Sequence, residues 1–138
     1  MRKRTHRGQH RQSGQALVET ALMILVIFMV VFWIFELGWL MYTYSVMANA
    51  ANEGVRYAIV RSGGDPTGTQ TVVKNFATTS LHDVSAMSVS VTFPDAGSTV
   101  PPSRVQVTVT YTYVPALSQF MTSPPTMHSY AEGRMVAQ

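Results

Sequence analysis

One long apolar stretch constrains this chain more than any other feature of its sequence. Residues 21–35 contain no charged, amide or hydroxyl side chain, and after Glu36 the apolar character resumes through residues 37–41. A helix rises about 1.5 Å per residue, so this stretch is long enough to cross the roughly 30 Å hydrocarbon core of a bilayer. A helix also satisfies its backbone hydrogen bonds within lipid. The sequence therefore predicts one membrane-spanning helix.

A basic arm precedes this stretch, and no acidic residue occurs among the first 18 positions. Because translocating basic side chains next to a span is unfavourable, such an arm stays in the cytoplasm. We therefore expect a cytoplasmic N-terminus and an exported C-terminal part. Nucleic-acid binding is the alternative reading of a basic arm, but this one is short and leads directly into the span. The topology-determining residues are Arg2, Lys3, Arg4, Arg7 and Arg11.

The overall net charge of +3 conceals a division along the chain. Five of the ten basic residues lie in the first 11 positions; from Gln15 onward, five Lys/Arg face seven Asp/Glu, which gives −2. The exported part therefore has no basic run that would attract nucleic acid. The chain has no cysteine, which excludes disulfides and Cys-ligated metal. A small domain without such cross-links gains little from its own core and often depends on partners.

Glu19 lies at the start of the apolar stretch, five positions after Gly14. A carboxylate is costly inside a bilayer and less so at its interface, so it calls for a partner. If the chain were cut after Gly14, the new amino group of Gln15 on a neighbouring subunit could pair with Glu19. Alternatively, Glu19 lies at the headgroup level, where the start of a helix favours an acid. The residues alone leave both open.

Three segments resemble the N-terminal part of TadE-like pseudopilins of the tight-adherence (Flp, type IVb) pilus system. They are residues 11–19 (Arg-Gln-Ser-Gly-Gln-Ala-Leu-Val-Glu), residues 35–38 (Phe-Glu-Leu-Gly) and the Ala-rich residues 48–58. The resemblance implies that a prepilin peptidase cuts between Gly14 and Gln15 and that Glu19 becomes the fifth residue of the mature chain. Type IVb prepilins often carry Phe or Tyr after that Glu, where this chain has Thr20.

The resemblance also implies a location and a set of partners. The expected location is a bacterial inner membrane, crossed once, with the C-terminal domain periplasmic or extracellular. The expected partners are a prepilin peptidase, other pseudopilins, the major Flp pilin and the inner-membrane assembly platform. A secretory signal peptide is the alternative for the N-terminal segment, because Ala48-Asn49-Ala50 resembles a cleavage site. The apolar stretch exceeds the usual signal-peptide length of about 7–15 residues, however.

Glu36 and four aromatic residues follow at the other end of the span. Aromatic side chains gather at membrane–water interfaces, so Trp33, Trp39, Tyr42 and Tyr44 are candidate interface anchors. Glu36 then lies near that interface, or it contacts the helix of a partner subunit. We favour the interface for Glu36.

The remainder predicts a small α+β domain. Helix-forming residues continue to about residue 62, with a stripe of mostly small side chains at Met47, Ala51, Gly54 and Ala58. A weaker helix is expected over residues 69–81, with Val72, Val73, Phe76 and Ala77 on one face. Residues 87–93 and 105–113 alternate between apolar and polar, which is typical of an antiparallel strand pair, and residues 127–136 are a candidate third strand.

These elements predict an α+β, pilin-like fold in which one long N-terminal helix packs against a small antiparallel sheet. The expected parts are a cleaved leader at residues 1–14, a long helix at 15–62 and an extracytoplasmic domain at 63–138. Catalytic and metal-binding motifs are not evident in the sequence, since His82 and Asp83 lack further ligands and the serines lack a nucleophile motif. We expect no enzyme and no cofactor. A structural subunit of a pilus and a membrane-anchored binding module remain as hypotheses.

Overall fold

A computed structural model describes residues 9–62, 65–81, 83–97, 103–116 and 123–135. The chain divides into two compact units, Met1–Gly38 and Trp39–Gln138. We call these the N-terminal unit and the C-terminal unit. Their common element is helix α1 (Gln9–Tyr57), which is continuous for 49 residues.

Helix α1 confirms the long N-terminal helix and begins at Gln9, six positions before the expected start at Gln15. The chain has no proline before Pro66, so no residue interrupts the backbone hydrogen bonds of α1. A π-helical turn, η2 (Ala58–Ser62), follows without a break. The helical segment thus ends at residue 62, as the composition indicates.

The second helix, α2 (Pro66–Ser80), has distinct caps at both ends. The side chain of Asp65 accepts a hydrogen bond from the backbone N–H of Thr67 at 3.0 Å. Pro66 occupies the first helical position. A backbone N–H at this position makes no hydrogen bond within the helix, so proline, which lacks the N–H, is tolerated there. At the other end, the backbone N–H of Leu81 donates to the carbonyl of Ala77 at 2.8 Å. The helix was expected to begin at residue 69, and it begins three residues earlier, at Pro66. The cap formed by Asp65 and the proline at the first position explain this earlier start.

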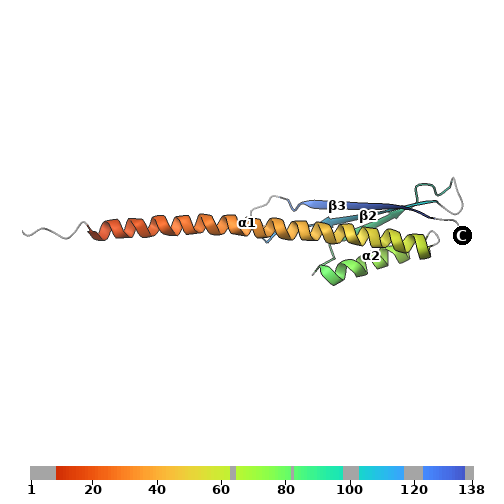
Figure 1. Cartoon of the computed structure of the whole chain (residues 1–138), viewed down its shortest axis with the longest axis horizontal. Coiled ribbons are helices and arrows are strands. Elements are labelled where there is room, and N and C mark those ends of the chain that lie inside the picture. The colour runs from red at the N-terminus through yellow and green to blue at the C-terminus, as the bar shows by residue number, and fades with distance from the viewer. Residues whose placement is uncertain (1–8, 63–64, 82, 98–102, 117–122, 136–138) are drawn as a thin grey trace, which may run out of the picture. The chain divides into compact units, whose positions relative to one another are not determined.

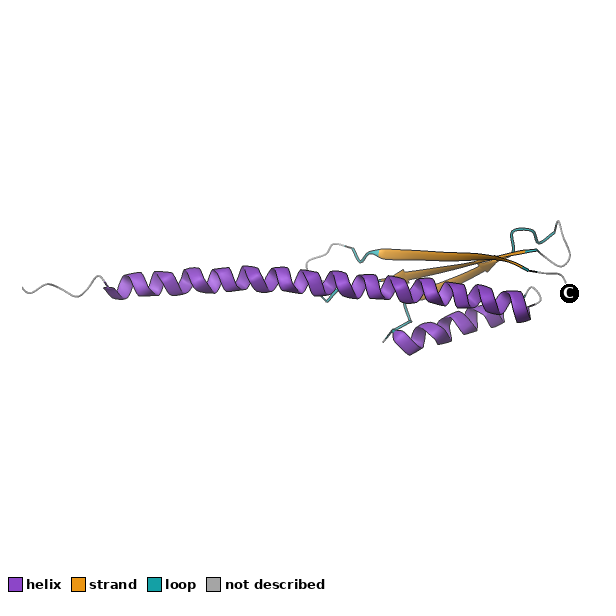
Figure 2. Cartoon of the chain, in the orientation of Figure 1, coloured by secondary structure: helices purple, strands orange, loops and turns teal. Residues whose placement is uncertain are grey.

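Three strands form one antiparallel sheet in the order β1-β2-β3 (Figure 2). They are β1 (Met87–Thr92), β2 (Arg104–Thr112) and β3 (Thr126–Arg134). Met87 pairs with Tyr111 across β1 and β2, and Tyr111 pairs with Met127 across β2 and β3. All three predicted strands are therefore confirmed, including the third. One face of the sheet is buried and the other carries mostly hydroxyl side chains.

The core of the C-terminal unit lies where α1, α2 and the sheet meet, and Figure 1 shows the strands and α2 lying along the C-terminal half of α1. Alternate residues of β2 are fully buried at Val105, Val107 and Val109. The stripe of mostly small residues on α1 is buried against them. Its predicted role in packing within the domain is confirmed, because Met47 and Ala51 have no exposed surface.

Two glycines mark the closest approaches between elements. A side chain at Gly54 of α1 would collide with Val73 of α2 and lie 3.3 Å from Val107 of β2. A side chain at Gly133 of β3 would lie 2.5 Å from Val55 and 2.8 Å from Ile59. Hydrogen alone fits at both positions, so α1 is held tightly between α2 and the sheet.

Two details of helix packing differ from the prediction. Phe76 is 39% exposed rather than on the buried face of α2, and Thr69 is buried in its place. The buried residues of α2 recur every four positions at Thr69, Val73 and Ala77, which turns Phe76 away from the core. The hydroxyl of Thr69 has no hydrogen-bond partner among the described residues. Its methyl group lies opposite Gly54, which explains why a β-branched residue is accommodated there.

Gly54→Ala should destabilise the C-terminal unit by about 1–3 kcal/mol, because the added methyl overfills a closely packed contact. The matched control is Gly38→Ala, in the same helix, where an added methyl meets nothing within 4 Å. That change should be neutral or stabilising by up to about 1 kcal/mol, since glycine is a poor helix former. Thermal unfolding in detergent, followed by circular dichroism, measures both. Equal melting temperatures for the two variants would contradict the packing argument.

Candidate membrane span and processing site

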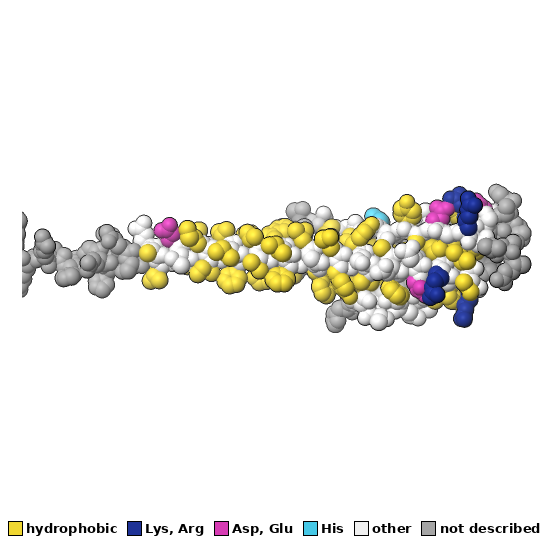
Figure 3. All heavy atoms as spheres, in the orientation of Figure 1, with side chains coloured by type: hydrophobic (Ala, Val, Ile, Leu, Met, Phe, Trp, Pro, Cys, Tyr) yellow, Lys and Arg dark blue, Asp and Glu magenta, His cyan; other side chains and the backbone are white. Residues whose placement is uncertain are grey.

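The N-terminal half of α1 has large apolar side chains without a covering element among the described residues. Exposed fractions reach 67% at Leu25 and 73% at Phe35. Within Gly14–Arg61, α1 contains a segment that by length and composition can cross a membrane. Figure 3 shows apolar side chains along this part of the helix on the face in view. Such a surface is unfavourable in water, so a lipid or protein environment is required to cover it.

Gly14, Gln15 and Glu19 all lie on α1 and are exposed. An added methyl at Gly14 meets nothing within 4 Å. Gln15 and Glu19 are four positions apart, which places them on one helix face about one turn apart. Thr20 donates a hydrogen bond from its hydroxyl to the carbonyl of Ala16 at 2.8 Å, so its polar group is satisfied inside the helix. The Glu19 side chain tilts toward the N-terminus of the helix, where a new amino group at residue 15 would lie about one turn away.

The predicted interface residues occupy consecutive turns of α1. Trp33 belongs to the N-terminal unit and is about half exposed, and Glu36 one turn later is half-buried. Trp39 and Tyr42 begin the C-terminal unit, with ring centroids 5.6 Å apart. The hydroxyl of Tyr42 donates to the carbonyl of Ser80 at 3.4 Å. Tyr44, the fourth aromatic residue, is 50% exposed.

The C-terminal unit starts within this aromatic segment rather than after it. Leu40 already packs against the core, and Thr43 is only 1% exposed. The Thr43 hydroxyl donates to the carbonyl of Trp39 at 2.9 Å, which satisfies its polar group without an outside partner. The sequence pattern did not reveal this burial. A threonine in place of an aliphatic residue obscures the apolar spacing from Leu40 to Met47.

Four of the basic residues, Arg2, Lys3, Arg4 and Arg7, lie outside the described residues. Arg11 falls in the first turns of α1, and its side chain is not described. Their role in topology therefore stays a prediction. His82, one of the two residues considered for chemistry, is also outside the described residues.

Charged pairs in the C-terminal unit lie on its surface. Arg56 donates to Glu53 one turn away at 2.6 Å and 2.9 Å, and this hydrogen bonding lowers the pKa of Glu53 and raises that of Arg56. Arg104 pairs with Glu132 across the sheet, which raises the pKa of Arg104. Burial raises the pKa of Tyr111.

Among the described residues, no cluster of three or more His, Asp or Glu side chains is placed to hold a metal ion. His128 lies on β3, where its Nδ1 is 3.1 Å from the hydroxyl of Thr110. The Glu53–Arg56 pair lines a cavity of about 420 Å³ together with Tyr57, Val60, Arg61 and Val72.

Comparison with known proteins bears on α1 alone. A family model described as TadE-like protein matches residues 14–56. No curated protein and no solved structure matches the chain. The matched segment begins at Gly14 and covers the apolar stretch, the aromatic residues and most of the small-residue stripe. The resemblance noted in the sequence is thus confirmed for residues 14–56, which are similar to the TadE-like family.

Proposed function

We propose that this chain is a minor pseudopilin, a structural subunit in the assembly of a tight-adherence (Flp, type IVb) pilus. The TadE-like match over residues 14–56 carries this proposal, because it begins at the expected cleavage position and contains Glu19 and the apolar helix. TadE-like proteins are structural pilus components, which supports a role without catalysis. In this role the C-terminal unit supplies contacts at the pilus base or tip.

The proposed topology is a single pass through the inner membrane. The basic arm stays in the cytoplasm, α1 crosses the bilayer and the C-terminal unit is exported. The exposed apolar surface of α1 supports this arrangement, since lipid covers it while the subunit is stored in the membrane. Neighbouring helices replace lipid when the subunit joins an assembly.

The proposed processing step joins Gly14, Gln15 and Glu19 in one mechanism. A prepilin peptidase removes residues 1–14 and leaves a positively charged amino group on Gln15. That group would lie about one helical turn before Glu19, whose side chain tilts toward the helix N-terminus. In an apolar environment an unpaired charge is strongly disfavoured, so the carboxylate stabilises the new terminus on its own chain or on a neighbouring subunit. Other pseudopilins, the major Flp pilin and the assembly platform are the proposed partners at this stage.

Gly14→Ala should abolish processing and leave a chain that retains its basic arm. The added methyl meets nothing in this protein, so its effect falls on recognition by the peptidase rather than on folding. Intact mass spectrometry of the protein recovered from membranes distinguishes a start at Gln15 from one at Met1. Gly38→Ala is the control for a glycine change in the same helix and should process normally. A normal cleaved mass for Gly14→Ala would contradict the proposed site, and an uncleaved natural chain would favour a membrane-anchored binding module.

Glu19→Ala should leave membrane insertion intact and reduce the number of pili, because the amino group of Gln15 then loses its compensating charge. Glu36→Ala is the matched control, since it removes the other acid of the apolar segment at the proposed interface. Counting pili by electron microscopy in cells that express each variant at equal level measures the effect. Unchanged pilus number with Glu19→Ala would refute the proposed role of this carboxylate.

The cysteine-free chain allows a direct test of topology. A membrane-impermeant maleimide should label Val60→Cys in spheroplasts, because Val60 is 70% exposed on the exported unit. Gln9→Cys, placed in the Gly14→Ala background to retain the arm, should react only after lysis. Labelling of Gln9→Cys before lysis would show that the arm is exported. Replacing the five basic residues of the arm with serine should weaken the labelling of Val60→Cys, because it removes the charge bias.

A further inference from the structure

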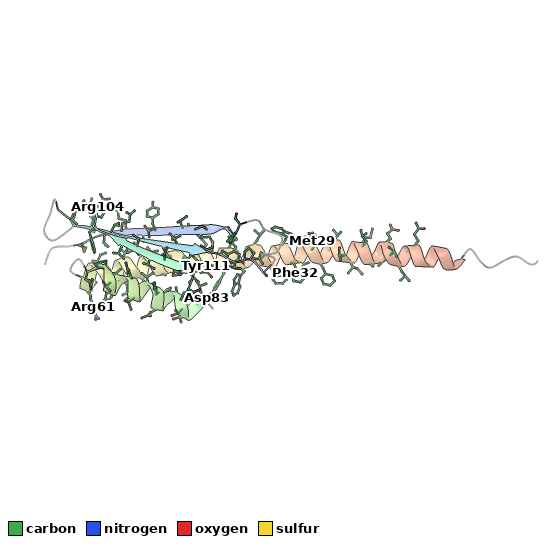
Figure 4. All side chains as sticks on the ribbon, turned by 180° about the vertical axis from the view of Figure 1, so that it is seen from behind. Met29, Phe32, Arg61, Asp83, Arg104 and Tyr111 are labelled. Carbon is green, nitrogen blue, oxygen red and sulfur yellow. The ribbon has the colours of Figure 1, made fainter. Side chains whose placement is uncertain are left out.

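The C-terminal unit has two distinct ends along α1. At one end, Tyr42 hydrogen-bonds Ser80, and the hydroxyl of Tyr111 donates to the carbonyl of Asp83 at 3.2 Å. At the other, Gly133 lies against Val55 and Ile59. Figure 4 shows Tyr111 and Asp83 toward one end of this unit, with Arg61 and Arg104 at the opposite end. We call the end with Tyr42 the proximal end, because α1 enters the unit there from the candidate span.

Charge is strongly segregated between these two ends. Asp83 is a charged residue near the proximal end, where its backbone carbonyl accepts the Tyr111 hydroxyl. Its carboxylate accepts a hydrogen bond from the backbone N–H of Ser85 at 2.8 Å. Figure 3 shows basic and acidic side chains gathered at the opposite end on the face in view. That distal group includes Glu53, Arg56, Arg61, Asp65, Asp95, Arg104, Glu132 and Arg134.

The proximal end exposes apolar and aromatic side chains instead. Trp39 and Met41 of α1 are 55% and 71% exposed. Val114 joins them from a different element, because β2 runs from Arg104 at the distal end to Thr112 and the chain continues two residues further. Val114 is 65% exposed. An apolar side chain in this position is unfavourable in water but suits the boundary of a bilayer.

Val114 is held in place by its neighbours on both sides. Tyr113 is 3% exposed, and its backbone N–H donates to the carbonyl of Pro125 at 3.0 Å. Pro115 is buried as well. Because both neighbours of Val114 are buried, the backbone at this point is fixed and the valine side chain is directed outward.

We propose that the proximal end of the C-terminal unit rests on the bilayer surface, with Val114 inserted at the level of the lipid headgroups and upper acyl chains. The proposal depends on the membrane span proposed above. If Glu19 lies at the inner interface, the 20 positions to Trp39 cover about 30 Å of helix, which places Trp39 at the outer interface. The low charge of the proximal end and its continuity with the span identify lipid as the occupant. The unit then meets the membrane at a second point outside α1.

Quenching by brominated lipid tests this contact. The chain has two tryptophans, Trp33 and Trp39, and replacing both with phenylalanine gives a silent background. Val114→Trp in that background should be quenched in phosphatidylcholine/phosphatidylglycerol vesicles whose acyl chains are brominated near the carbonyl end. Val60→Trp is the matched control, because Val60 is similarly exposed on the distal part of the unit, and it should keep its emission. Trp39→Phe alone leaves Trp33 as the reporter of the span itself.

The outcomes separate the contact from the span. Quenching of Val114→Trp and Trp33, without quenching of Val60→Trp, supports the inference. Quenching of Trp33 alone overturns the surface contact and leaves the span intact. Quenching of Val60→Trp as well would show that the unit lies on the membrane without a preferred end, which also overturns it. An unquenched Trp33 would refute the span and the contact together.

A second measurement uses the absence of cysteine and avoids the bulk of tryptophan. When the protein is unfolded and neither detergent nor lipid is present, Val114→Cys and Val60→Cys should react with a charged maleimide at similar rates. In vesicles, Val114→Cys should react several-fold more slowly than Val60→Cys. Equal rates in vesicles would overturn the proposed contact even if the tryptophan variants failed to fold.

Discussion

The size of the side chains along α1 determines what can surround each part of the helix. Before Gly38 the helix carries large apolar residues that extend outward, whereas after it the buried positions are mostly alanine, glycine and valine. Small residues allow α2 and the sheet to approach, with Gly54 at the tightest point. Because every backbone hydrogen bond of a helix interior is internal, one continuous helix can serve both lipid and a protein core. The fold of the C-terminal unit depends on this change in side-chain size.

Much of the fold follows from patterns that are local in the sequence. The apolar stretch predicted the long helix, and alternation at residues 87–93 and 105–113 predicted an antiparallel strand pair that is confirmed. Residues 127–136 were a candidate third strand because two strands alone are marginal, and β3 confirms it. What escaped prediction depended on packing between distant elements. Thr43 is buried because its hydroxyl bonds within α1, and Phe76 is exposed because Thr69 fits beside Gly54. Neither fact is visible without knowing which elements meet.

For the candidate functional residues, too, the order along the chain indicates more than the packing does. Gly14, Gln15 and Glu19 could be selected from their order along the chain, and the family match begins among them. The chemistry proposed for them involves a peptidase and neighbouring subunits, so the fold of one chain cannot display it. The match ends at residue 56, which leaves α2 and the sheet outside it. Those elements are the part of the chain that can distinguish this subunit from others that share the TadE-like segment.

The continuity of α1 has a mechanical consequence. Many membrane-anchored domains are joined to their anchors by flexible loops. Under tension such a loop extends first, and force reaches the domain only afterwards. Here the helix that carries the candidate span itself continues into the core, where Ala51, Gly54 and Ala58 are packed closely. A pull on the C-terminal unit is therefore transmitted through a ladder of backbone hydrogen bonds rather than through a slack connection. Separating the unit from the candidate span would require unwinding of the helix or rupture of the core.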